Sequence, residues 1–200
     1  MFSHRGLARE LAILFNQKLK QEKEIFYDIP LFNKHKESFK QKSKLLIKNK
    51  AKNIESFAAL EIKLNETPSI LEHIVNLSCL DITSHSFLVD TSNYVMFDIG
   101  QPLHGFDREQ IKSLTFRDDV EGEFLALDNT KIIIKQGNIV LEDENKNITS
   151  LVGIMGGKQS EVSLKTKEVL IESVCLKKET IKKTIKLYGK KTESAIRMEK

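Results

Sequence analysis

Short segments of this chain bring together side chains that could do chemistry. In one of them Pro102 and Gly105 flank a single histidine, His104, shortly after Gly100 ends an apolar run. A histidine in a tight loop can orient water, accept a proton or donate a hydrogen bond near neutral pH. No serine or cysteine is visibly paired with it, so a nucleophile–histidine triad is not indicated. A hydrogen-bonded turn histidine without a catalytic role is the alternative.

Glu172 interrupts an apolar run between Glu168 and Val174. If that run is a strand, its period of two places Glu172 on the same face as Leu170 and Val174. A carboxylate there either points to water or sits inward, where it needs partners. The residues alone leave both interpretations open, and the solvated face is the commoner case.

A glycine-rich segment, Gly153 to Gly157, lies between these two features. Glycines suit a turn in which the backbone approaches a neighbour closely, and such turns expose amide groups that can hold a carboxylate, phosphate or carbonyl oxygen. A plain turn is the alternative.

Metal and redox sites are not expected. Cys79 and Cys175 are far apart and outside any C-x-x-C or Cys/His pattern, so they predict neither a disulfide scaffold nor a zinc site. We expect two small buried apolar residues instead. The five histidines are scattered, without a pair at metal-binding spacing.

Composition indicates a globular chain without a membrane segment. Its 200 residues are 40% hydrophobic, and no apolar run approaches the roughly 20 residues that a membrane helix needs. The N-terminus lacks the apolar core of a signal peptide. We therefore expect a cytoplasmic protein with no membrane partner.

The net charge of +4 conceals two basic runs. Eight lysines lie between Lys34 and Lys52, and seven lie between Leu176 and Lys191. Segregated basic runs are typical of proteins that bind a polyanion, although a solvated surface gives the same pattern.

Helical periodicity predicts three helices. Leu7 to Leu19 has an amphipathic pattern, Thr67-Pro68 suits the start of a helix that reaches about Leu77, and Glu179 to Leu187 precedes Gly189, which can end a helix. Asp107 can cap a short helix over Arg108 to Ile111. Residues 21–53 lose the pattern and read as a lysine-rich variable insert or linker.

Alternating and β-rich runs predict a series of strands. The expected strands are Phe57 to Leu64, Leu88 to Phe97, Phe124 to Leu127, Lys131 to Lys135, Ile139 to Glu142, Ile148 to Ile154 and Glu168 to Val174. Turn residues between the central four predict an antiparallel meander. The fold class is therefore α+β, a layered β/β/α domain, and no nucleotide-binding glycine loop follows any strand.

The order of motifs resembles the editing domain, also called B3/B4, of the bacterial phenylalanyl-tRNA synthetase β subunit. That family carries, in order, S-x-R-G-x-A-R-E, D-x-T-N-Y-V, G-Q-P-x-H-A-F-D, G-x-x-G-G, L-L-E-S and R-T-E-A-S-x-R-F-E. This chain matches the order with Ser3, Arg5, Gly6, Ala8, Arg9, Glu10; Asp90, Asn93, Tyr94, Val95; Gly100 to His104, Phe106, Asp107; Gly153, Gly156, Gly157; Leu170, Glu172, Ser173; and Thr192, Glu193, Arg197, Glu199. The resemblance extends over residues 1–200, apart from 21–53.

The resemblance implies an aminoacyl-tRNA ester hydrolase that removes tyrosine from mischarged Tyr-tRNA(Phe). It implies that Glu172 binds the tyrosine phenol, and that His104 and Asn93 are the polar groups around the ester and the α-amino end. Four residues would line the substrate pocket: Gly153, Gly156, Thr192 and Ser194. A synthetic site built for phenylalanine cannot strongly reject an analogue that only adds a hydroxyl, so a second site has to read that hydroxyl.

The family also implies partners and cofactors. This chain looks like one domain of a longer subunit, with the tRNA(Phe) acceptor end as its ligand and a synthetase α subunit as partner in an α2β2 assembly. The domain itself would need no cofactor, since ATP and Mg²⁺ belong to the full synthetase.

Several positions depart from the family pattern. Gly105 replaces an alanine, Ser194 replaces the usual pocket alanine, and Ser86-Phe87 replace a common pair of asparagines. A non-catalytic tRNA-binding or structural module with a degraded editing pocket is therefore the alternative function.

Overall fold

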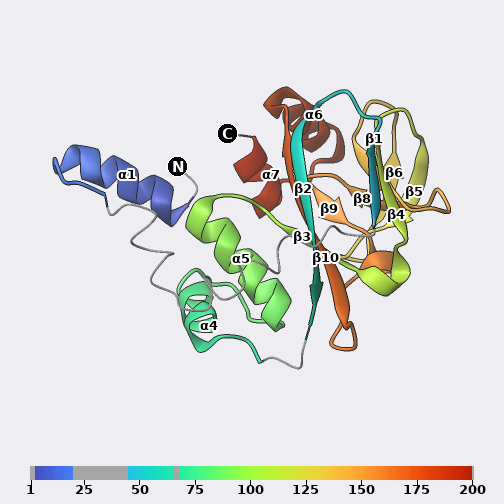
Figure 1. The fold of residues 1–200 in the computed structure, drawn as a ribbon. Coiled ribbons are helices and arrows are strands. Elements are labelled where there is room, and N and C mark those ends of the chain that lie inside the picture. The colour runs from blue at the N-terminus through green and yellow to red at the C-terminus, as the bar shows by residue number, and fades with distance from the viewer. Residues whose placement is uncertain (1–2, 20–44, 65–67, 200) are drawn as a thin grey trace.

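The protein folds into two β layers, a separate hairpin and a set of flanking helices (Figure 1). The structure, a computed structural model, describes residues 3–19, 45–64 and 68–199. Helices and mainly antiparallel strands occur together in these ranges, which confirms the α+β class.

The larger layer is a five-stranded sheet with the order β1-β4-β7-β8-β9. β1 runs parallel to β4, and every other neighbouring pair is antiparallel. The strands are β1 (Leu46–Asn49), β4 (Ser113–Arg117), β7 (Val140–Glu142), β8 (Ile148–Leu151) and β9 (Met155–Gly156).

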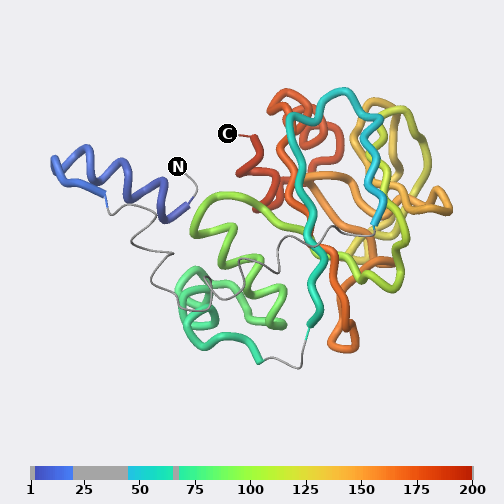
Figure 2. Tube along the Cα trace, viewed as in Figure 1, coloured from blue at the N-terminus to red at the C-terminus, as the bar shows by residue number. Residues whose placement is uncertain are grey.

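The second layer is an antiparallel sheet with β10 (Glu168–Leu176) between β2 (Ile54–Lys63) and β3 (His104–Asp107). The chain leaves β2, passes through the helical region beside this sheet and returns to it as β3 (Figure 2). β3 is short and lies at the edge, so residues of other elements can approach it from the side.

The hairpin consists of β5 (Gly122–Leu125) and β6 (Lys131–Ile134), which form a sheet of their own. An isolated bridge between Ala126 and Gly157 links it to the end of β9. The expected meander is thus divided: β7, β8 and β9 follow one another as antiparallel neighbours, whereas the earlier hairpin stands apart.

The helices cover the second layer on one side and at one end. α4 (Leu71–Ser78) and α5 (Phe87–Ile99) lie across the β2–β10–β3 sheet from the larger layer, and α6 (Lys178–Tyr188) and α7 (Glu193–Met198) lie at one end (Figure 1). α1 (His4–Leu14) projects from the rest and contacts α5, where Arg5 Nε lies 3.1 Å from Asp98 Oδ2. Two short 3-10 helices follow strands, η2 (Arg108–Gln110) and η3 (Lys158–Ser160).

Two apolar clusters hold these layers together. The larger contains Phe106 and Leu170 from the second layer, Phe116 and Leu141 from the first, and Ile181 from α6. The smaller lies under the β5–β6 hairpin and includes Ala195 of α7. The α7 end of the chain is therefore fixed against the glycine-rich segment by core packing.

One expected strand is a helix. Leu88 to Phe97 is rich in β-branched and aromatic residues, but residues 87–99 form α5. Ser86 caps its first turn, accepting a hydrogen bond from the amide of Val89, and Gly100 ends it in the left-handed conformation at φ 87°. These boundary residues, together with packing on the sheet, outweigh the weak intrinsic preference for strand.

Two helix boundaries were also wrong. α1 begins after the cap Ser3 and stops at Leu14, five residues before the expected end, and Asn16 then adopts a positive φ of 49°. α4 begins at Leu71 with Ile70 as its N-cap, so Pro68 lies outside the helix; Thr67 is not among the described residues.

Other elements agree with the sequence. β2, β10 and α6 lie where expected, Gly189 ends α6 with φ 65°, and Asp107 caps η2 through the amide of Glu109. The range 21–53, expected to be an insert, divides: 21–44 lies outside the described residues, whereas β1 is a strand of the larger sheet and its neighbours Leu45 and Ala51 are buried in the core.

Candidate functional site

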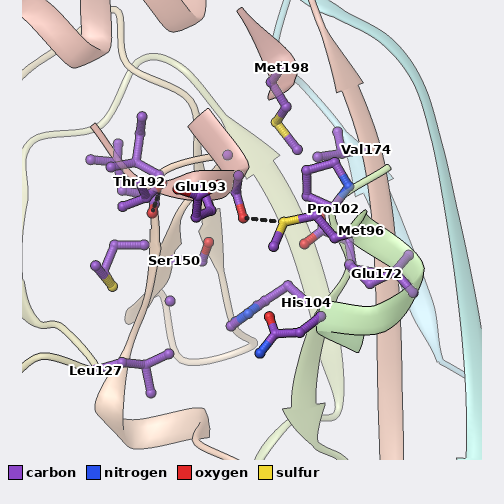
Figure 3. A pocket seen from close by; sticks show the side chains of 18 residues that line it. Met96, Pro102, His104, Leu127, Ser150, Glu172, Val174, Thr192, Glu193 and Met198 are labelled. Carbon is purple, nitrogen blue, oxygen red and sulfur yellow. Dashed lines mark hydrogen bonds between the residues drawn. The ribbon is translucent and has the colours of Figure 1, made fainter. Parts of the chain in front are cut away.

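A cavity of about 260 Å³ opens where the edge strand β3 meets β10, α5, the glycine-rich segment and α7 (Figure 3). Seven residues expected to form a site line this one cavity: Asn93, His104, Gly153, Gly156, Glu172, Thr192 and Ser194. They come from five separate parts of the chain, so the fold brings together what the sequence keeps up to a hundred residues apart.

His104 and Glu172 lie directly opposite each other on β3 and β10. Opposed residues of an antiparallel pair point to the same face, and this face carries the buried Phe106 and Leu170. His104 is the first residue of a strand, so the expected loop is not observed. Glu172 is only 6% exposed, so the solvated-face interpretation is wrong.

Both side chains hold a polar atom that is buried and unsatisfied. Neither Nε2 of His104 nor Oε1 of Glu172 has a hydrogen-bond partner within the parts of the chain that the structure describes. More than nine in ten buried polar groups in folded proteins are paired, and an unpaired one costs about 1–3 kcal/mol. Two such atoms beside one cavity indicate a site shaped for a polar ligand.

Burial also shifts both ionisations toward the neutral forms. Desolvation lowers the pKa of His104 to about 4 and raises the pKa of Glu172 to about 7. Between these values the imidazole is neutral and the carboxyl is largely protonated. Near neutral pH His104 can orient a water molecule through Nε2, and Glu172 can either accept or donate a hydrogen bond.

Gly156 makes room for the imidazole. A Cβ at this position would lie 2.2 Å from Cε1 and 2.5 Å from Nε2 of His104, too close for any side chain. The ring of Phe106 meets the imidazole edge-on, with 4.4 Å between ring centroids. The glycine and the phenylalanine therefore fix the ring orientation, and the close approach explains why this position of β9 needs glycine.

Thr192 connects α7 to the glycine-rich segment. Its hydroxyl accepts a hydrogen bond from the amide of Ala195 as the N-cap of α7 and donates one to the carbonyl of Ile154. Ser194, the second residue of α7, places its hydroxyl 3.9 Å from the sulfur of Met96. This wall of the cavity therefore contains the hydroxyl of Thr192, which caps α7, and the hydroxyl of Ser194, which contacts the sulfur of Met96.

Asn93 is presented by α5, whose start is held firmly. Asp90 is fully buried and accepts hydrogen bonds from the hydroxyls of Ser69 and Ser84 at 2.6 Å and from the amide of His85 at 2.9 Å. Although burial opposes ionisation, these bonds together lower the pKa of Asp90. Asp90 is therefore a structural residue that orients the helix bearing Asn93.

The sequence did not identify the apolar and hydroxyl lining of the cavity. Met96 in α5, Leu127 in the turn of the β5–β6 hairpin, Ser150 in β8 and Met198 at the end of α7 surround the polar residues (Figure 3). Nothing in their local pattern distinguishes them from ordinary core residues, because their role arises only from tertiary packing.

Two of the three departures from the family pattern lie away from the cavity. Gly105 alternates with His104 on β3, and a Cβ there would lie 3.0 Å from Leu88 on α5, on the opposite face of the sheet. Phe87 is the first residue of α5 and does not line the cavity. Only Ser194 changes the cavity wall itself.

The two cysteines do not lie where the sequence predicts. Cys79 and Cys175 are both exposed, which contradicts the expectation that they are buried. Within the described ranges, no cluster of three or more His, Cys, Asp or Glu could hold a metal ion. The same ranges contain no helix long and apolar enough to cross a bilayer.

Comparison with known proteins identifies the class. The model of the B3/4 domain family matches residues 55–200, and the chain therefore belongs to this family. The fold resembles an N-terminal fragment of the phenylalanyl-tRNA synthetase β subunit from Pyrococcus horikoshii, with a TM-score of 0.50 over 70% of this chain and 46% of that one, at 15% identity.

The sequence is similar to phenylalanine–tRNA ligase β subunits. It is 32% identical to that of Leptospira biflexa over 100% of this chain, and 34% identical to that of Dehalococcoides mccartyi over 98% of this chain. In each case it spans about a quarter (24%) of the relative's length. The family resemblance expected from the motifs is thereby confirmed.

Proposed function

We propose that this chain is the editing module of a phenylalanine–tRNA ligase β subunit and hydrolyses tyrosine wrongly esterified to tRNA(Phe). One observation carries the proposal: Glu172 and His104 each leave a buried polar atom unsatisfied beside a single cavity. The cavity volume of about 260 Å³ lies just below the range of about 300–1,000 Å³ of small-molecule pockets, which suits one amino-acid side chain.

Glu172 supplies the discrimination. Its unpaired Oε1 can form a hydrogen bond with the phenol of tyrosine, whereas phenylalanine would leave it buried and unpaired. A site built to bond a hydroxyl rejects the analogue that lacks it far more strongly than an apolar pocket rejects an added hydroxyl. Hydrolysis would therefore be directed to the tyrosyl ester.

His104 acts on water in this proposal. Because its pKa is held at about 4, the neutral imidazole orients a water molecule and is too weak a base to hold the proton at neutral pH. The water oxygen attacks the ester carbonyl, the carbon–oxygen bond to the ribose breaks, and the ribose oxygen receives the proton. Asn93 lies on the cavity wall where its amide can bind the ester or the α-amino group.

The proposal includes the remaining expectations. The ligand is the acceptor end of tRNA(Phe), a synthetase α subunit is the partner in an α2β2 assembly, and the protein works in the cytoplasm. No cofactor takes part in this domain, since water, two side chains and the ester suffice for the reaction; ATP and Mg²⁺ belong to aminoacylation in the full enzyme.

A non-catalytic tRNA-binding or structural module is the second candidate. Thr192 favours it, since both of its hydrogen bonds serve α7 and the turn at Ile154. Buried unsatisfied atoms argue against it, because a purely structural core would pair these atoms or replace them by apolar groups.

Deacylation of Tyr-tRNA(Phe) by the full-length protein distinguishes the editing hydrolase from the non-catalytic module. We expect release of tyrosine well above the uncatalysed rate, and a loss of about 100-fold in His104→Ala, because the attacking water loses the group that orients it. The matched control is His85→Ala, a histidine outside the cavity. A wild-type rate equal to the uncatalysed rate, with aminoacylation intact, would select the structural module.

A further inference from the structure

A second cavity, of about 460 Å³, lies against the first. Both cavities are lined by Pro102, Val174 and Met198, so these three side chains form the wall between them. Figure 3 shows the three together along one side of the proposed editing site. Whatever occupies the second cavity therefore lies next to the group bound in the first.

Arg197 lines the second cavity and carries an unsatisfied donor. Its side chain is only 5% exposed, and its guanidinium lies 4.3 Å from the ring centroid of Phe97. Its Nη1 donates to the carbonyl of Glu193 and forms an ion pair with the Glu193 carboxylate at 2.5 Å. Its Nε is buried and has no hydrogen-bond partner among the residues that the structure describes. A buried N–H without an acceptor is as unusual as the two unsatisfied atoms of the first cavity.

The other polar groups of this cavity carry both signs of charge. Lys178 lies at the first turn of α6, and Glu179 and Glu55 contribute carboxylates. Because Arg197 is paired with Glu193, Lys178 and the two carboxylates are the remaining charges, and this set does not suit a simple anion. They suit a ligand that has acceptors and donors together, and a nucleotide combines phosphate oxygens with the amino group of a base.

A row of lysines continues from this cavity. Lys178, Lys182 and Lys186 are spaced four residues apart on α6 and are exposed, while Ile181 and Thr184 face the core. Residues at this spacing lie on one side of a helix. The row therefore begins at the cavity and follows α6 outward, an arrangement that matches a phosphodiester backbone.

We propose that the second cavity binds the nucleotide that precedes the esterified nucleotide. The α6 lysines then contact the phosphates of the same strand that lie further from the ester. The proposal rests on the proposed function, because it assigns the next part of the same substrate. Within it, Arg197 and Lys178 are positioning residues: they fix the end of the nucleic acid and take no part in the reaction.

Two substrates separate this proposal from the proposed function. The first is Tyr-tRNA(Phe), and the second is 3′-O-tyrosyl-adenosine, which carries the ester without any preceding nucleotide. In full-length protein carrying Lys178→Glu and Lys182→Glu, we expect KM for Tyr-tRNA(Phe) to rise about tenfold and hydrolysis of the small ester to stay at the wild-type rate. In the matched control, the same charge reversal is made at Lys165 and Lys167, two exposed lysines before β10.

Binding of a short single-stranded RNA that ends in cytidine-cytidine-adenosine provides a second readout. Losing two phosphate contacts should lower the slope of log Kd against log salt by about 1.4. Arg197→Lys, which keeps the charge and removes the Nε donor, should weaken RNA binding several-fold, with thermal unfolding measured to establish that it folds. Inorganic phosphate should not compete at millimolar concentration.

The outcomes are distinguishable. If wild type hydrolyses neither substrate, the proposed function fails. If it hydrolyses both and the α6 variants retain the wild-type KM and salt slope, the second cavity is not a nucleotide site although the editing site stands. Competition by inorganic phosphate alone would contradict a nucleotide and indicate a simple anion site.

Discussion

Gly156 controls the position of His104. Because any Cβ would overlap the imidazole, Gly156→Ala must push the ring out of its place between β9 and Phe106. We expect Tyr-tRNA(Phe) deacylation to fall at least tenfold while the fold persists, measured by deacylation and circular dichroism. Gly122→Ala is the matched control, since its Cβ would meet only the end of Ile148 at 3.2 Å. Full activity in Gly156→Ala would show that the ring position is unimportant.

The two shifted pKa values predict how stability depends on pH. The pKa of Glu172 rises from 4.5 to about 7, so its contribution to stability is fully present below pH 4.5 and is lost as pH rises toward 7. The pKa of His104 falls from 6.5 to about 4, so its contribution is present above pH 6.5 and is lost as pH falls toward 4. Between pH 4.5 and 6.5 the two contributions oppose each other.

Replacing the Glu172 carboxyl by an amide should remove its contribution to the pH dependence of the unfolding free energy. Relative to wild type, Glu172→Gln should gain on the order of 1–3 kcal/mol of unfolding free energy as pH rises from 4.5 to 7.5. Urea unfolding at several pH values measures it, with Glu168→Gln as the control for loss of a half-exposed carboxylate on the same strand. If the difference in unfolding free energy between Glu172→Gln and wild type stayed constant over this pH range, the raised pKa of Glu172 would be refuted.

Single residues were only partly predictable from the sequence. The types and order of His104, Glu172 and the glycines marked the site, since few residue types serve such chemistry. Whether Glu172 points inward was not predictable. The alternation of a strand shows which residues share a face with Glu172, but it does not show which of the two faces is buried. Arg197 was recognised only as a motif position, and its unsatisfied Nε follows from packing against Phe97.

At the scale of elements, Thr192 joins α7 to the cavity wall. Thr192→Ala removes the N-cap and the bond to Ile154, so we expect a loss of about 0.5–2 kcal/mol in unfolding free energy together with reduced deacylation. Thr192→Ser keeps the hydroxyl and should restore both. Thermal unfolding and deacylation of the two variants give the comparison; unchanged stability in Thr192→Ala would remove the capping role.

The elements show where reasoning from local patterns fails. The strands β2 and β10 and the helix α6 were predicted because their periodicity and end residues agree. α5 was mistaken for a strand because β-branched and aromatic residues favour strands, although Ser86 and Gly100 already marked the two ends of a helix. This error matters for function, since the helix presents Asn93 and Met96 to the cavity.

At the scale of the whole molecule, the cavity arises where the β2–β10–β3 sheet, the larger sheet and α7 converge. No local pattern predicts that convergence, which depends on the register of β3 on β10 and on the return of α7 to the glycine-rich segment. The preserved order of motifs predicted it indirectly, through the resemblance to a family with this fold.

The most direct test of the account is the ratio of tyrosyl to phenylalanyl ester hydrolysis on tRNA(Phe), in wild type and in Glu172→Ala, which leaves no group to bond the phenol. If Glu172 reads the phenol, wild type should favour the tyrosyl ester, and the variant should lose about 1–3 kcal/mol of that preference, roughly 5- to 150-fold in the ratio of kcat/KM. Hydrolysis of the tyrosyl ester should remain above the uncatalysed rate, because His104 is unchanged. A Glu172→Ala variant that keeps the full wild-type preference would contradict the assignment of this cavity as the tyrosine-reading site.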